Sequence, residues 1–342
     1  MGKTDIPLDK LGTYLEKNIN YFHSLTFAKK FKGGQSNPTY LLTAGSGQYV
    51  LRRKPFGKLL QSAHAVEREF RVMSALRDSD VPVPHMIHLC EDEDVIGAVF
   101  FVMSYVEGRH FWNASLPELG SAARANIYDE MNRVLAALHS VDVEAAGLGD
   151  YGQPGSYFER QVSRWTGQYR ASQTEDIPAM ETLIEWLPAN MPPDDGRSSL
   201  IHGDYRLDNM LFAKTEDKAL ALLDWELSTL GHPFADLAYQ CMQLRLPQDS
   251  PVMGLAGLDR RALGIPTEEE YIARYCERTG LGGIPDWTFY LMFSFFRLAA
   301  ILQGVLKRAM DGNASSTEAF KFGAMAGPLA AIAVQLLDGD HQ

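Results

Sequence analysis

One stretch of sequence decides the fold, and from residue 200 to residue 238 it reads LIHGDYRLDNMLFAKTEDKALALLDWELSTLGHPFADLA. A short apolar run precedes a polar loop that contains His202, Asp204 and Asn209. A second apolar run ends directly before Asp224. A strand, a polar loop, a short hairpin and a second strand of this kind predict several oxygen ligands at one end of a sheet. Hard cations such as Mg²⁺ bind oxygen ligands and accompany substrate phosphates, so the layout favours metal-assisted phosphoryl transfer.

The same loop matches the kinase catalytic-loop pattern H-R-D-L-x-x-x-N at its His, Asp and Asn, and residues 224–226 read DWE where D-F-G would stand. Gly203 after the histidine, together with DWE, resembles the aminoglycoside phosphotransferase and choline kinase family of the kinase-like fold. More closely, the chain resembles the phosphotransferase domain that some eukaryotes carry fused to acyl-CoA dehydrogenases, together with its free-standing bacterial relatives. The resemblance extends from about Gly33 to the end of the chain.

Three runs that alternate apolar and polar residues, 27–31, 39–44 and 49–53, predict strands ahead of this loop. The turn GGQSN separates the first two and would be a plain hairpin turn if it stood alone. Its position ahead of the catalytic loop favours a phosphate-covering loop that uses backbone N–H groups. The residues that we expect at the nucleotide there are Gly34, Gln35, Ser36 and Asn37.

The third of these strands places Arg52 where kinases carry the phosphate-pairing lysine of V-A-I-K. Arginine keeps the charge but is not a neutral replacement, because its guanidinium is a planar fork. A helix over residues 63–76 carries Glu69 beside its apolar stripe, whereas Glu67 points away. We therefore expect Glu69 to pair with Arg52, and the alternative is a solvated helix charge.

The resemblance implies that Met103 and Tyr105 lie in the hinge between two lobes, whose backbone would meet adenine. We place the lobe boundary after Glu107, which gives an N-terminal nucleotide-binding lobe of residues 1–107 and a C-terminal catalytic and substrate-binding lobe of residues 108–342. The predicted fold is α+β and two-lobed, with a small antiparallel sheet plus a helix above a mainly helical lobe. The helices expected on either side of the strands cover residues 8–18, 121–138, two within 151–187, 237–244, 267–279, 285–310 and 316–337.

Roles follow from the chemistry of kinase-type transfer. Asp204 would accept the proton of the acceptor hydroxyl, and Asn209 and Asp224 would hold Mg²⁺ on the phosphates of ATP. Arg206 could offset charge on the transferring phosphoryl group, or it could make a surface ion pair, and the sequence favours neither.

Two further residues are expected to support the loop. His202 is more consistent with bracing the loop by hydrogen bonding than with reacting, and Asp236 with a cap or a brace. Only twelve positions separate Asp224 from Asp236, which is too short for the long segment on which protein kinases dock a polypeptide. The acceptor should therefore be a small molecule.

Composition narrows the classes further. The chain has 342 residues, enough for two lobes that each have a core. Its net charge of −11 argues against nucleic-acid binding, and suits either a cationic substrate or simple solubility. Three widely spaced cysteines indicate a reducing compartment. Because no secretory segment is visible and the apolar run 287–306 is interrupted by polar residues, we expect a cytoplasmic protein without a membrane partner.

The predicted activity is γ-phosphoryl transfer from ATP, with Mg²⁺, to a small-molecule hydroxyl. Resemblance favours a hydroxy acid or hydroxyacyl-CoA, with a possible acyl-CoA dehydrogenase partner, and the acidic balance would also suit an aminoglycoside or choline. Arg160, Arg164 or Arg297 could meet an anionic acceptor, although helix-surface solvation is the simpler interpretation of the first two. Arg297 lies among apolar residues and needs a partner, either an internal carboxylate or the substrate.

Two other classes of function stay open. A catalytically silent kinase-like binding module would keep the fold without the chemistry. A metal-dependent hydrolase could use the loop carboxylates, but it gives no reason for the glycine-rich turn, Arg52 and Glu69 upstream.

Overall fold

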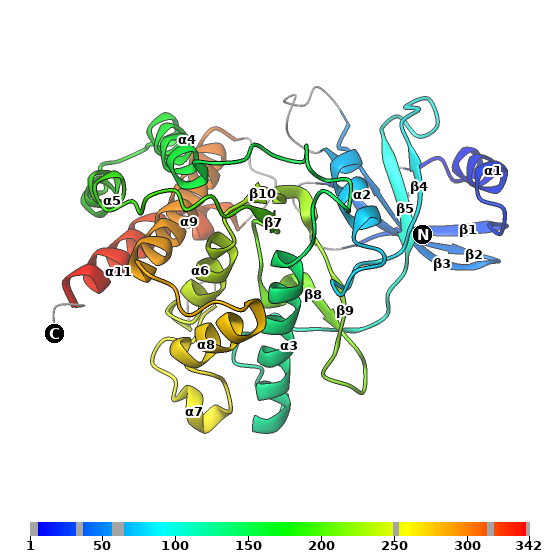
Figure 1. Ribbon diagram of the computed structural model, residues 1–342. Coiled ribbons are helices and arrows are strands. Elements are labelled where there is room, and N and C mark those ends of the chain that lie inside the picture. The colour runs from blue at the N-terminus through cyan, green and yellow to red at the C-terminus, as the bar shows by residue number, and fades with distance from the viewer. Residues whose placement is uncertain (1–5, 32–36, 57–64, 249–252, 313–317, 340–342) are drawn as a thin grey trace. The chain divides into compact units, whose positions relative to one another are not determined.

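The computed structural model (Figure 1) describes residues 6–31, 37–56, 65–248, 253–312 and 318–339. Its chain forms two compact units. The first comprises Met1–His110, Ala146–Leu148 and Asn209–Ser228, and the second comprises Phe111–Ala145, Gly149–Asp208 and Thr229–Gln342. The division passes between Asp208 and Asn209, so the stretch that decides the fold contributes to both units. The lobe boundary that we predicted after residue 107 remains a prediction.

The first unit contains a five-stranded antiparallel sheet with the strand order β1-β2-β3-β5-β4. Buried and half-buried positions alternate along its second strand, as the period of two in the sequence predicts. The second and third strands join through a tight turn in which Gly47 has φ of 132°, a value that favours glycine. The five strands are β1 (Leu25–Lys30), β2 (Thr39–Ala44), β3 (Gly47–Arg53), β4 (Met86–Cys90) and β5 (Phe100–Ser104).

Two helices accompany this sheet. In α1 (Leu8–Asn18), Leu11 and Leu15 lie four residues apart on one helix face and join the buried cluster of the sheet. The second helix, α2 (Val66–Ala75), contacts β4 and β5 and presents Glu69 toward the interior. A buried carboxylate on an otherwise apolar face requires a partner, which the site supplies.

A second, three-stranded sheet completes the first unit. Its strands are β6 (Arg109–His110), β8 (Met210–Phe212) and β9 (Ala219–Leu222), in the order β6-β8-β9. Because β8 and β9 are antiparallel, with Met210 opposite Leu222, the residue before β8 and the residues after β9 lie at the same end. This register positions Asn209 near Asp224.

The second unit is mainly helical. It contains a short antiparallel ribbon of β7 (Ser199–Ile201) and β10 (Thr229–Gly231). Helix α9 contacts the most other helices: α4, α5, α6, α10 and α11 all pack on it. The helices are α3 (Ser121–His139), α4 (Tyr157–Ser172), α5 (Pro178–Ala189), α6 (Phe234–Gln243), α7 (Arg260–Leu263), α8 (Glu268–Thr279), α9 (Trp287–Met310), α10 (Ala319–Gly323) and α11 (Ala326–Gly339).

Two helical runs, Trp287–Met310 and Ala319–Gly339, are long and apolar enough to cross a membrane by length and composition alone. The most apolar part of the first run is 78% buried inside the protein, as the sequence predicted for a core helix. The corresponding part of the second run is 28% buried.

Two predictions about this fold were wrong in detail. The helix expected over residues 316–337 is two helices, α10 and α11, because Pro328 has no N–H with which to continue the preceding turn. The strand before the catalytic loop and the strand before Asp224 also do not share one sheet, since β7 pairs with β10 whereas β9 pairs with β8. The oxygen ligands of the loop are therefore not all at one end of a single sheet.

Candidate active site

The catalytic loop after β7 is held by a buried carboxylate of α6. Asp236 accepts hydrogen bonds from the backbone N–H groups of His202, at 2.6 Å, and Gly203, at 2.8 Å. The Nε2 atom of His139 lies 3.5 Å from the same carboxylate, which is 1% exposed. Burial alone would raise the pKa of Asp236, but the hydrogen bonds from His139 and from the backbone outweigh it and lower that pKa. Asp236 braces the loop, as we expected.

The loop is also fixed from within and from α3. The ring of His202 is fully buried, and its Nδ1 atom accepts a hydrogen bond from the backbone N–H of Asp204 at 3.2 Å. Gly203 has φ of 82°, a conformation that glycine adopts without strain. The hydroxyl of Tyr205 donates to the carbonyl of Met131 at 2.6 Å. His202 therefore has the bracing contact that we predicted for it.

The side chain of Asp204 is partly exposed to solvent and lies beside Arg206. Its side chain is 26% exposed, so a substrate hydroxyl can reach it. The Nε atom of Arg206 lies 4.0 Å from Asp204, and the same guanidinium binds Asp208 through two N–H groups, one of them at 2.9 Å. Tyr239 of α6 is buried, and this burial, together with the charge of Asp204, raises the pKa of its hydroxyl.

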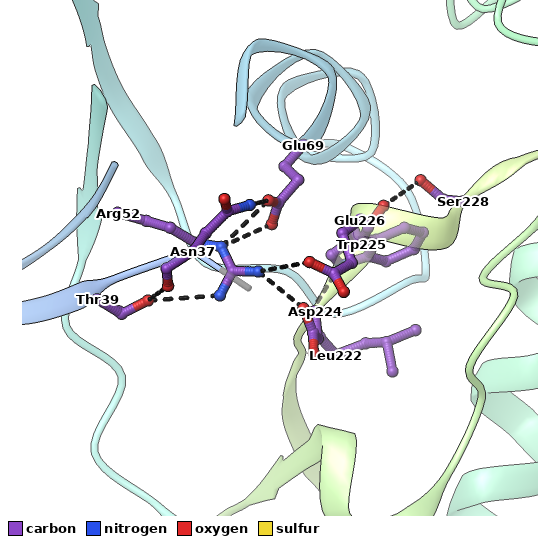
Figure 2. Close-up of polar contacts among 9 residues, drawn as sticks. All are labelled: Asn37, Thr39, Arg52, Glu69, Leu222, Asp224, Trp225, Glu226 and Ser228. Carbon is purple, nitrogen blue, oxygen red and sulfur yellow. Dashed lines mark hydrogen bonds and ion pairs between the residues drawn. The ribbon is translucent and has the colours of Figure 1, made fainter. Parts of the chain in front are cut away.

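In the first unit, Arg52 of β3 is the centre of an ion-pair network (Figure 2). Its Nε atom lies 2.9 Å from Glu69, so the predicted pairing is confirmed. One Nη atom lies 2.8 Å from Asp224 and 3.7 Å from Glu226, two partners that were not predicted. Burial alone would lower the pKa of Arg52, but these carboxylates, Glu69 first, raise it and keep the guanidinium charged.

Of the other residues that we predicted to bind the nucleotide, Asn37 contacts this network. Asn37 is buried, and its amide donates to Glu69 at 2.8 Å (Figure 2). Met103 lies in β5 opposite Val50 of β3, and Tyr105 directly follows β5. The three remaining predicted residues, Gly34, Gln35 and Ser36, lie outside the described residues. Contacts of this set with a nucleotide remain a prediction.

The proposed metal ligands lie close together in the first unit. The carbonyl of Asn209 accepts a hydrogen bond from the N–H of Leu223 at 2.8 Å, and Asp224 follows directly. Asp224 has φ of 63° and ψ of 60°, a left-handed conformation that is uncommon for a residue with a side chain and is typical of functional sites. The Oδ1 atom of Asp224 lies 2.8 Å from Arg52. An amide and a carboxylate oxygen fit Mg²⁺, which binds one or two protein ligands together with substrate phosphates.

The arginines that might meet an anionic acceptor differ in environment. Arg160 donates to backbone carbonyls of the preceding loop, including Gln153 at 2.7 Å, so it fastens that loop. Arg164 is exposed on α4, with its guanidinium 5.5 Å from the ring of Trp165. Arg297 is buried in α9 and donates to the carbonyl of Gly203 at 2.5 Å.

The comparison with known families decides the class of this protein. The profile of the phosphotransferase enzyme family matches residues 28–290. The chain belongs to this family. The predicted enzyme class, a phosphotransferase, is thereby confirmed, and the residues that we selected in the loop and in β3 all fall within the matched region.

Relatives of this phosphotransferase support the more specific resemblance. The mouse acyl-CoA dehydrogenase family member 10 is 49% identical over 331 residues, which are 96% of this chain and 31% of that relative. The chain therefore spans about a third of the length of this relative. A solved structure from Ralstonia eutropha, provisionally named an aminoglycoside phosphotransferase, is 50% identical, with a TM-score of 0.88 over 96% of this chain and 98% of that chain.

More distant structures confirm the kinase-like α+β fold of the phosphotransferase. The spectinomycin phosphotransferase solved with ADP and spectinomycin has a TM-score of 0.65 at 16% identity, over 97% of this chain and 98% of that chain. At this identity the likeness shows the fold alone.

Proposed function

We propose that this phosphotransferase moves the γ-phosphoryl group of ATP, assisted by Mg²⁺, to a hydroxyl group of a small molecule, and that the acceptor is a hydroxy acid or a hydroxyacyl-CoA. The observation that carries the proposal is the short path from Asp224 to Asp236. A single 3₁₀ turn, Trp225–Leu227, leads into β10, and only two residues separate β10 from α6. Because all of these residues belong to or adjoin regular elements, the segment offers no docking platform for a polypeptide substrate.

The roles of the residues follow from their contacts. Asp204 accepts the proton of the acceptor hydroxyl as its oxygen bonds to the γ-phosphorus, while the bond from that phosphorus to the bridging oxygen breaks and ADP leaves. Arg206, held by Asp208, offsets negative charge on the transferring group. Asn209 and Asp224 would hold Mg²⁺, which would neutralise charge on the nucleotide phosphates.

The relatives support the donor and the acceptor separately. Phosphotransferases of the same fold have been solved with ADP or ATP and an antibiotic that carries hydroxyl groups, which supports ATP as the donor. The relatives named as acyl-CoA dehydrogenases support an acceptor from acyl chemistry and a functional link with such a dehydrogenase. The name of the Ralstonia eutropha structure and the net charge of −11 favour a second candidate, a cationic aminoglycoside.

One experiment tests the proposal and separates the two acceptors. ADP release from ATP and Mg²⁺ is measured against hydroxy acids, hydroxyacyl-CoA thioesters, aminoglycosides and choline. We expect stimulation by the hydroxy acids or thioesters, and loss of that stimulation by a factor of about 10³ in Asp204→Asn, because the base is removed. The variant must retain the melting temperature of the wild type. Stimulation by aminoglycosides alone would replace the acceptor, and an Asp204→Asn variant with full activity would contradict the mechanism.

A further inference from the structure

A cavity of about 600 Å³ lies in the second unit between three helices, α3, α7 and α8. Figure 1 shows these helices together, and both α7 and α8 contact α3. The cavity is large enough for a small organic molecule, since ligand pockets commonly enclose about 300–1,000 Å³. None of its described lining residues belongs to the catalytic loop or to the network of Arg52. The cavity is therefore a separate candidate site, to which the proposed function assigns no role.

The walls of this cavity are held in place by hydrogen bonds within the unit. The amide of Asn132 in α3 donates to the carbonyl of Tyr271 in α8 at 2.8 Å, and Asn132 is 1% exposed. The guanidinium of Arg124 in α3 donates to the carbonyl of Leu263, the last residue of α7, at 3.3 Å. Both α7 and α8 are thus fastened to α3 by protein groups alone, and the cavity between them is preformed.

Four of the lining residues are charged, and they form two ion pairs. Arg274 of α8 lies 2.8 Å from Asp129 of α3, and Arg261 of α7 lies 3.5 Å from Glu270 of α8. Asp129 also pairs with Arg278 at 2.8 Å, so one carboxylate serves two guanidinium groups. Three positive charges thus meet two negative ones beside the cavity, in a chain whose net charge is −11. A local excess of positive charge in an acidic protein favours an anionic ligand.

Arg261 and Arg274 have hydrogen-bond donors to spare for such a ligand. A guanidinium has five N–H donors, and each of these two makes a single hydrogen bond within the described ranges. Their side chains are 75% and 56% exposed, so water screens their ion pairs and a ligand can share or displace them at small cost. Glu270, which Arg261 contacts, lies one helical turn before Arg274, so both guanidinium groups can reach one ligand.

We propose that this cavity binds a small organic phosphate, with the phosphate group held between Arg261 and Arg274. A phosphate monoester carries about two negative charges and three terminal oxygens, so it can accept from two guanidinium groups at once. A carboxylate has one charge and two oxygens, which a single guanidinium fork already satisfies. The lining also includes Ile265 and Pro266, which would contact a short organic body. The inference goes beyond the proposed function and does not depend on it.

The first arm of the test measures binding to the wild-type protein by isothermal titration calorimetry, with ADP and Mg²⁺ in excess to occupy the proposed nucleotide site. The probes are ethyl phosphate, its uncharged parent ethanol, and propionate as a carboxylate of similar size. We expect ethyl phosphate to bind at least about 10-fold more tightly than propionate, and ethanol not to bind, because two guanidinium groups pair with the phosphate. No binding of ethyl phosphate at millimolar concentration, or equal affinity for propionate, would overturn the inference.

The second arm assigns the binding to the two arginines. Arg261→Gln and Arg274→Gln should each weaken the binding of ethyl phosphate by about 10-fold, because each removes charge-assisted hydrogen bonds. Arg170→Gln is the matched control, since it removes another exposed arginine of the second unit that pairs with a carboxylate, and it should change nothing. Arg206→Gln tests the active site as the place of binding. Loss in Arg206→Gln but not in the cavity variants, or an equal loss in Arg170→Gln, would overturn the inference.

The third arm fills the cavity and leaves its charges in place. Ala125 lines the cavity at an exposed position of α3, so Ala125→Trp adds a large ring there without removing an ion pair. Binding of ethyl phosphate should weaken by at least about 10-fold. Unchanged binding would place the probe on surface charges outside the cavity and overturn the inference. If Ala125→Trp or Arg274→Gln does not fold, Arg261→Gln decides, because a side chain that is 75% exposed contributes little to folding.

Discussion

Arg52 and Arg297 place the same guanidinium in two opposite environments. Arg52 lies within 4 Å of three carboxylates, those of Glu69, Asp224 and Glu226, and its side chain is 12% exposed. Arg297 is buried as deeply but contacts one backbone carbonyl and two aromatic rings. The charge of Arg52 is balanced by these carboxylates, whereas none of the residues that the structure describes forms an ion pair with Arg297.

The difference teaches what each arginine can do for a ligand. To bind a nucleotide phosphate, Arg52 must weaken or break one of its ion pairs. Asp224 is the carboxylate among its partners that would also bind a metal ion. Arg297 has no such choice of carboxylates among the described residues, and its contacts are a backbone carbonyl and two aromatic rings. The protein therefore holds Arg52 by charge compensation and holds Arg297 by a loop carbonyl and aromatic rings.

The largest effect on stability should come from breaking the ion-pair network of Arg52. Glu69→Ala removes the buried partner of Arg52 and the acceptor of the Asn37 amide, and should lower the free energy of unfolding by about 3 kcal/mol. Urea denaturation at low salt measures it. Glu67→Ala, on the same helix, is the matched control; it breaks a more exposed pair with Lys54 and should cost less than about 1 kcal/mol. A cost no larger than that of the control would mean that Asp224 and Glu226 balance Arg52 without Glu69.

A smaller effect on stability should follow from changing Asp236, the buried carboxylate that accepts hydrogen bonds from the catalytic loop and forms no ion pair with Arg297. Asp236→Asn replaces one acceptor oxygen by an amide that cannot accept, and should cost about 2 kcal/mol near neutral pH. Because folding lowers the pKa of Asp236 below its ordinary value of 3.8, the ionised form stabilises the fold above about pH 4. That contribution is lost as the pH falls through the lowered pKa.

The stability difference between the wild type and Asp236→Asn should therefore be full near pH 7 and shrink in acid. Urea titrations at several pH values between neutrality and acid measure it. A difference that stays constant with pH would show that the charge of Asp236 contributes nothing and that only its shape matters.

The smallest effect should come from an arginine that is not buried. Arg170 binds Glu181 through two N–H groups at the surface, with exposed fractions of 44% and 40% for the two side chains. Water and salt screen such pairs, so Arg170→Ala should leave the melting temperature within the error of the wild type. A loss comparable to that of Glu69→Ala would contradict the argument that burial makes the ion pairs of Arg52 matter more for stability than a surface pair.

Much of the site could be predicted because its signals are local. The loop residues from His202 to Asn209 are close in sequence, and the stripe of α2 identified Glu69 as the inward carboxylate. The bracing role of Asp236 also followed from its position near the start of a helix. Partners at long range carried no such signal: the contact between Arg52 and Asp224 joins residues that are 172 positions apart.

By itself, then, the sequence predicted most of the strands and helices and the phosphotransferase loop, because periodicity and motif spacing act over a few residues. Only the tertiary structure decided that β7 and β9 belong to different sheets, that Asp224 and Glu226 join Glu69 at Arg52, and that Arg297 is buried with no ion-pair partner in the described ranges. The physical reason is that charge compensation depends on which side chains meet in space. The apolar neighbours of Arg297 in α9 predicted its burial, but they could not show what lies opposite its charge.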